Sequence, residues 1–255
     1  MRLEQLFEDI HSDQSKLSSA KKAFDDLMSE IKGRVELLGL DDFDAFEKSY
    51  LDIMSKLYTY TFKLKYKDEP ITVRILPKTH LDRNRLGVLN TTSIDDGHGV
   101  KYQYQITIFV NPNDDFDLIS DSDFYRTFAK RYQKVFIHEF VHFIDAVESD
   151  NQENYTNTKR KLRQQGKYIN TPQEYNAFYI QMMSEIADAF ENRSVISIFK
   201  KDPTFNNFLS LINIETHAGE MLKGLEGKYK KAFKKRLYQL YNYYLDEFSD
   251  QTTEK

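Results

Sequence analysis

The chain has 255 residues, of which 40% are hydrophobic and 30% are charged, and its net charge is −4. This composition is typical of a folded globular protein, and the negative charge gives no general attraction to nucleic acid or to an acidic membrane surface. Because cysteine is absent, disulfides and thiolate metal sites are excluded, and any metal must be bound by His, Asp or Glu. No N-terminal signal pattern and no run of about 18 apolar residues is present. We therefore expect a cytoplasmic protein without a membrane partner, and a virion-associated location fits as well.

The first 66 residues are predicted to be mostly helical. Apolar residues recur at helical spacing in residues 3–10 and again in residues 24–31. Gly33 and Gly39 are expected to interrupt this stretch before a second helix over residues 46–57. From residue 58 the pattern begins to alternate, as in a β-strand.

The middle of the chain is predicted to be rich in strands. Residues 71–76 and 86–92 have the composition of short strands, and residues 95–99 that of a turn. Residues 101–111 alternate strictly, with Tyr and aliphatic side chains on one face. The other face carries mostly polar side chains, so this segment is predicted to be a strand.

Helices are predicted for the rest of the chain. One runs from residue 121 or 123 to about residue 149 without Gly or Pro, a second starts at the Thr-Pro-Gln-Glu sequence of residues 171–174, and more follow over residues 193–248. These elements predict an α+β fold, mainly helical, with a small mixed or antiparallel sheet before the long helix. The expected regions are an N-terminal helical region (1–66), a core (67–192) and a C-terminal helical region packed on that core (193–255).

The sequence HEFVH lies within the long predicted helix. His138 and His142 are four residues apart, so both imidazoles project from the same face and can bind one metal ion. Neutral imidazole is a good zinc ligand, and zinc makes a coordinated water much more acidic. Glu139 lies beside the pair and can take the proton from that water as a general base. An amphipathic helix with two structural histidines is the simpler alternative.

An HExxH motif in an uninterrupted helix, after an alternating strand and before further helices, resembles the zincin metallopeptidases over about residues 70–190. The resemblance implies a twisted sheet, an active-site helix, a bound zinc ion and a third protein ligand. In the metzincin pattern a glycine at position 145 and a histidine at position 148 would supply that ligand. This chain has Asp145 and Glu148 there. The resemblance is therefore to the gluzincin type, in which a glutamate on a later helix is the third ligand.

Two glutamates are candidates for this third ligand. Glu174, with Pro172 and Ala177, resembles the P-x-E-x-x-A element that follows HExxH in compact zincin-like peptidases, and we prefer it. Glu185, with Asp188, loosely resembles the acidic element of thermolysin-like enzymes, but its spacing is one residue short. An acidic residue in the first turn of a helix also has a purely structural explanation in the helix dipole.

Other residues are expected to support the site. Asp145 and Glu148 can accept the second ring N–H of a metal-bound histidine, or they can form ordinary salt bridges. The resemblance also implies a donor for the developing oxyanion, for which His217 is preferred over Tyr168 and Tyr175.

The strand over residues 101–111 has two interpretations. Zincins bind a peptide along a sheet edge beside the metal, which would place Gln103, Gln105 and Thr107 on that edge. The alternative is an ordinary buried strand.

We therefore expect a zinc-dependent metallopeptidase with a protein or peptide substrate. The alternatives are a non-enzymatic structural or virion-associated protein that keeps the fold and metal site, and a peptidase-fold toxin with one protein target. The Lys-, Asn- and Tyr-rich composition suits a phage or bacterial protein. Basic residues over 228–236 are interpreted as the solvated face of a helix rather than a nucleic-acid site.

Overall fold

The structure is a computed structural model that describes residues 3–37, 46–78, 86–95, 97, 100–111, 124–148, 172–216 and 218–250. The chain forms two compact units, residues 1–157 and residues 158–255. The predicted boundaries after residues 66 and 192 do not coincide with this division. The N-terminal helix packs against the first strand and the motif helix, and the first strand pairs within the sheet. Residues before and after position 66 therefore belong to the same unit.

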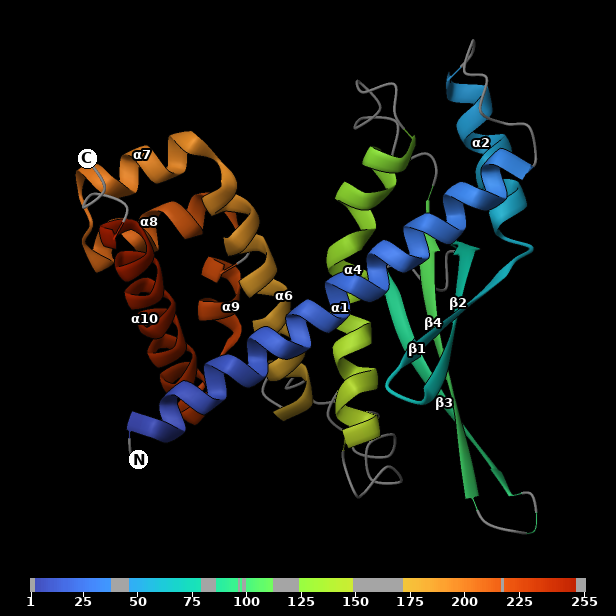
Figure 1. Ribbon diagram of the computed structural model, residues 1–255, viewed down its shortest axis with the longest axis horizontal. Helices are drawn as coiled ribbons and strands as arrows, with labels where there is room; N and C mark the ends of the chain where they lie inside the picture. The colour runs from blue at the N-terminus through green and yellow to red at the C-terminus, as the bar shows by residue number, and fades with distance from the viewer. Residues whose placement is uncertain are drawn as a thin grey trace. The chain divides into compact units, whose positions relative to one another are not determined.

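The first unit contains three described helices and four strands (Figure 1). In chain order they are α1 (Leu3–Leu37), α2 (Phe46–Leu57), β1 (Thr61–Tyr66), β2 (Glu69–Pro77), β3 (Gly87–Asp95), β4 (Val100–Val110) and α4 (Phe124–Glu148). The predicted interruption at Gly33 is wrong, because α1 continues through it to Leu37. A Cβ at Gly33 would meet no atom within 4 Å, so nothing there requires a break. Gly39 lies outside the described residues.

The strands form one mixed sheet in the order β1-β2-β4-β3. β1 pairs with β2 and β3 pairs with β4 in antiparallel orientation, whereas β2 and β4 are parallel. β4 therefore lies between two strands in the described sheet, so of the two interpretations of residues 101–111 the sheet edge is wrong. The outer strand next to β4 is β3.

One face of this sheet is buried. The alternating side chains Tyr104, Ile106, Ile108 and Val110 of β4 are buried, as the sequence pattern predicts, together with apolar side chains of β1 and β2. α4 contacts β3 and β4, and α1 contacts β1 and α4, so the two helices cover that face (Figure 1).

The second unit is helical throughout its described residues. Its helices are α6 (Pro172–Glu191), α7 (Arg193–Lys201), α8 (Phe205–Glu215), α9 (Ala218–Gly224) and α10 (Gly227–Asp250). The predicted start of a helix at Pro172 is confirmed, and the break near Pro203 separates α7 from α8. At that break Thr204 caps α8, because its side chain accepts a hydrogen bond from the Asn207 backbone N–H.

Aromatic rings fill the core of this second unit. The rings of Phe190 and Tyr244 stack with centroids 4.3 Å apart, and Phe199 and Phe208 surround them. Described helices therefore dominate both units, with one small mixed sheet, which confirms the predicted α+β class. No helix among the described residues is long and apolar enough to cross a membrane.

Candidate metal centre and catalytic carboxylate

The motif lies in the most deeply buried part of α4. Aromatic side chains recur every fourth residue from Phe124 to Phe140 and pack ring against ring along one side of the helix. Phe136 also contacts Phe24 of α1, with ring centroids 5.5 Å apart. Residues 136–144 are all buried, so this segment is enclosed on every side of the helix. Packing of this kind fixes the side-chain rotamers of the motif.

The two motif histidines converge on one point. Their Nε2 atoms are 3.2 Å apart, and the rings meet edge to face with centroids 4.7 Å apart. His142 is fully buried and His138 is 8% exposed. Two nitrogens that share a tetrahedral zinc ion at the usual bond length lie about 3.3 Å apart. The observed separation therefore fits a shared metal ion.

Glu174 joins these histidines in a group of possible metal ligands. One ligand atom from each of His138, His142 and Glu174 lies within 4.8 Å of the other two. Glu174 is in the first turn of α6 and is fully buried. Glu185, the alternative third ligand, is only half-buried, and its Oε1 accepts a hydrogen bond from Gln181 at 3.1 Å. Two imidazoles and one carboxylate are a donor set that zinc commonly takes.

Glu139 is held by the backbone of β3. Its Oε2 accepts a hydrogen bond from the Leu89 N–H at 2.8 Å, and the side chain is buried. The Phe109 N–H donates to the Leu86 carbonyl, so residue 86 faces β4 in this antiparallel pair. Because backbone groups alternate in direction along a strand, the Leu89 N–H faces away from β4. Glu139 therefore lies at the outer edge of the described sheet.

A close approach of β3 to α4 makes this hydrogen bond possible. A Cβ at Gly87 would lie 2.6 Å from Val135 Cγ1 and 3.0 Å from Glu139 Cγ, so only glycine fits here without a shift of these side chains or of α4. The sequence pattern alone does not single out Gly87 or Leu89. A glycine at the start of a strand is a weak signal, and the strand that lies beside the motif becomes known only with the sheet order.

Asp145 and Glu148 connect α4 to neighbouring elements. Asp145 forms an ion pair with Lys16 of α1 at 2.5 Å. Glu148 accepts hydrogen bonds from the Tyr66 hydroxyl at 2.7 Å and from Lys67 Nζ at 3.0 Å, at the end of β1. These contacts support the salt-bridge role that the sequence also allows.

The same contacts shift the pKa values of two of these groups. Partial burial alone raises the pKa of Glu148, but the hydrogen bonds from Tyr66 and Lys67 outweigh it and lower the pKa below its ordinary value. Burial likewise opposes the charged form of Lys16, but the Asp145 carboxylate outweighs it and raises the pKa of that ammonium group. Both shifts favour the ion-paired state.

The described structure does not support any of the three residues expected to act as the oxyanion donor. His217, the preferred candidate, and Tyr168 lie outside the described residues. Tyr175 is buried within the second unit, where its ring packs against Tyr229 at 5.4 Å and lies under the Arg236 guanidinium at 5.4 Å. These contacts give Tyr175 a packing role between α6 and α10.

Comparison with known proteins does not assign a function to this group of residues. No protein-family model matches the chain, and neither a curated protein nor a solved structure is significantly similar to it. The functional argument therefore rests on the residues of the chain itself.

Proposed function

We propose that the chain is a zinc-dependent metallopeptidase of the zincin type. In this proposal His138, His142 and Glu174 bind the zinc ion, Glu139 is the general base, and the reaction is hydrolysis of a peptide bond. The observation that carries the proposal is the 3.2 Å separation of the two Nε2 atoms, with a buried carboxylate on the residue between them in the motif. The grouping of Glu174 with the histidines supports it as the third ligand that a catalytic zinc site requires.

The role of Glu139 follows from its surroundings. A zinc ion in such a site acts as a Lewis acid and makes water a stronger acid. Glu139 Oε2 is fixed by the Leu89 N–H, and Oε1 of the same carboxylate is then the oxygen that takes the proton. Burial excludes bulk water from this carboxylate, which strengthens the electrostatic interactions of the proton transfer. The same group returns the proton to the leaving amine.

The sheet edge beside Glu139 suggests how a peptide is presented. β3 is one of the two outer strands of the described sheet, and its alternate backbone groups, including those of Thr91, face away from β4. An extended peptide pairing with β3 would pass the carboxylate of Glu139. This assigns to β3 the role that the sequence suggested for residues 101–111.

Measurements of zinc content and proteolysis test the proposal. We compare the native chain with Glu139→Gln and Glu174→Ala, using bound zinc measured by mass spectrometry and cleavage of casein and of unfolded polypeptides. Glu139→Gln should keep the zinc and lose cleavage by at least about a hundredfold, the usual size of a general-base contribution. Glu174→Ala should lose both zinc and cleavage, because a third ligand is removed.

Glu185→Ala is the matched control, because it removes a half-buried glutamate of the same helix. This variant should keep both zinc and activity. If the native chain binds no zinc and gains no activity when zinc is added, the proposal is wrong. If it binds zinc through these residues but cleaves nothing, and Glu139→Gln changes no measured property, the non-enzymatic structural protein replaces it.

A further inference from the structure

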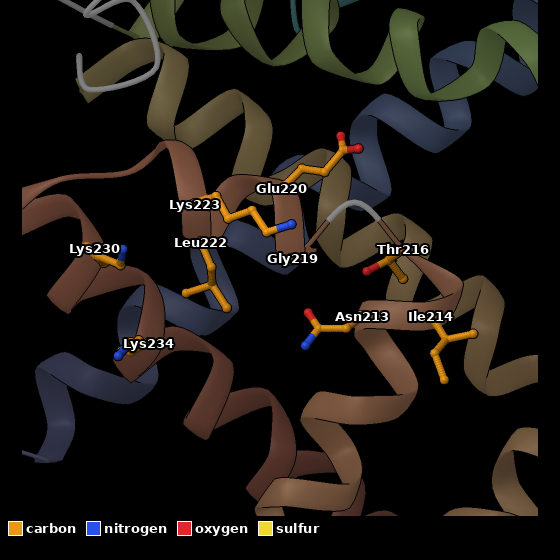
Figure 2. A pocket seen from close by; sticks show the side chains of 9 residues that line it. All are labelled: Asn213, Ile214, Thr216, Gly219, Glu220, Leu222, Lys223, Lys230 and Lys234. Atoms are coloured by element: carbon orange, nitrogen blue, oxygen red, sulfur yellow. The ribbon is translucent and has the colours of Figure 1, made fainter.

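The second unit contains a hollow whose lining includes none of the proposed zinc ligands. It has a volume of about 830 Å³ and lies among the end of α8, α9 and the start of α10 (Figure 2). Its lining is Asn213, Ile214, Thr216, Gly219, Glu220, Leu222, Lys223, Lys230 and Lys234. A hollow of this size falls within the range of small-molecule sites.

Three lysines from two different helices line this hollow. Lys223 comes from α9, and Lys230 and Lys234 are one turn apart on α10. In Figure 2 the Lys223 side chain extends toward the hollow, whereas the carboxylate of Glu220 is directed away from its centre. Within the described part of the chain, no ion pair involves any of these three lysines. The hollow is therefore positively charged.

The surrounding sequence strengthens this charge. Residues 223–236 contain seven Lys or Arg and one acidic residue, in a chain whose net charge is −4. Like charges around one hollow repel one another, and an anion placed between them removes that repulsion. The basic segment interpreted from sequence as a solvated helix face thus contributes two of its lysines to a concave site, together with a third from another helix.

The other lining groups indicate the class of ligand. The Asn213 carboxamide projects into the hollow opposite Lys223 and offers a hydrogen-bond donor (Figure 2). Leu222 and the largely exposed Ile214 supply apolar surface beside the ammonium groups. Lysine binds phosphate as a compact point charge, and three lysines match a group with about three negative charges. We propose that this hollow binds a small organic phosphate with two or more adjacent phosphate groups.

Isothermal titration calorimetry with inorganic pyrophosphate tests the proposal on the full chain. The protein is freed of metal beforehand, so that phosphate cannot bind through a zinc ion. Lys230→Gln/Lys234→Gln should weaken binding of pyrophosphate by about tenfold or more, since two charge-assisted contacts are lost. The control is Lys231→Gln/Lys235→Gln, which removes the same charge at the same spacing of the same helix but outside the hollow. It should change the affinity by less than about threefold, the residual long-range effect of charge.

Three outcomes would overturn this inference. One is the absence of pyrophosphate binding to the native chain at millimolar concentration. The second is an equal loss in both double variants, which would mean diffuse attraction to the whole basic face, as for a nucleic acid. The third is equal binding of citrate, which would mean that phosphate is not the preferred anion. None of these outcomes bears on the zinc site, because the metal is absent from the assay.

Discussion

Replacing Gly87 by alanine should push the edge strand away from the motif helix. The new Cβ would lie 2.6 Å from Val135 Cγ1 and 3.0 Å from Glu139 Cγ, so these side chains must shift, or α4 and β3 must move apart by several tenths of an ångström. Overpacking of this kind costs about 1–3 kcal/mol, and the lower entropy of the unfolded chain offsets about 0.4–1 kcal/mol. We expect Gly87→Ala to lower the free energy of unfolding by about 1–2 kcal/mol. The melting temperature should then fall by about 2–8 °C.

The same change should disturb the Leu89–Glu139 hydrogen bond. Because that bond is 2.8 Å long in the native chain, a displacement of β3 by a few tenths of an ångström lengthens it toward the outer limit of hydrogen-bond distance and weakens it. In the double variant Gly87→Ala/Val135→Ala the closest clash is removed, but the contact with Glu139 remains. Stability should therefore recover in part, whereas cleavage of casein should stay low and zinc content should stay unchanged.

Gly33→Ala provides the control for this experiment. It is the same chemical change inside α1, where a Cβ would meet no atom within 4 Å, so it should stabilise the chain by up to about 1 kcal/mol. Thermal unfolding followed by circular dichroism gives both melting temperatures. If Gly87→Ala melts at or above the native temperature, the close approach of β3 and α4 is refuted. If the double variant recovers stability and cleavage together, Gly87 has a packing role only.

Three further predictions concern the metal, one ion pair and one aromatic contact. Removing zinc with a chelator should lower the melting temperature of the native chain. The lost stability should be about 2.7 kcal/mol where free zinc was present at 100 times Kd. The melting temperature of Glu174→Ala should fall much less. The folded-state pKa of Glu148 is lowered, so this carboxylate stabilises the fold above pH 4.5, and that stabilisation is lost as the pH falls through the folded-state pKa. The free energies of unfolding of the native and Glu148→Gln chains, measured with denaturant, should therefore converge in acid. The Arg236 guanidinium of α10 lies 4.4 Å from the centre of the Tyr179 ring of α6. Arg236→Ala should therefore lower the free energy of thermal unfolding by about 1 kcal/mol, and Arg236→Lys by less. Equal stability of all three chains would contradict a stabilising cation–π contact.

Local features of the structure could be predicted well from sequence. The run of residues without Gly or Pro that contains the motif forms one helix, α4, and the strict alternation of residues 101–111 matches β4 and its buried side chains. These predictions succeed because hydrophobic periodicity and helix-breaking residues determine structure over only a few neighbouring residues. The predicted interruption at Gly33 fails for the same reason. A helix long enough to pack along most of its length tolerates one glycine, and the sequence does not show that packing partner.

Features that depend on distant pairing could not be predicted. Either strand of the β3–β4 hairpin can pair with β2, and the alternation within β4 does not decide which one does. The edge next to Glu139, and with it the roles of Gly87 and Leu89, therefore follows only from the folded sheet. The motif itself identified His138 and His142 as candidate ligands, but zinc binding by these histidines and by Glu174 stays a proposal.

The packing of α1 on α4 also has a consequence for how the chain is made. Lys16 and Asp145, which form an ion pair between these helices, are 129 residues apart in sequence. At a synthesis rate of about 5–20 residues per second, α1 leaves the ribosome roughly 6–26 s before its partner helix. During that interval Phe24, which is buried in the finished protein, lacks its ring contact with Phe136 of α4. The apolar face of the N-terminal helix therefore stays exposed to water until α4 is made, and α4 is the last described element of the first unit to be synthesised.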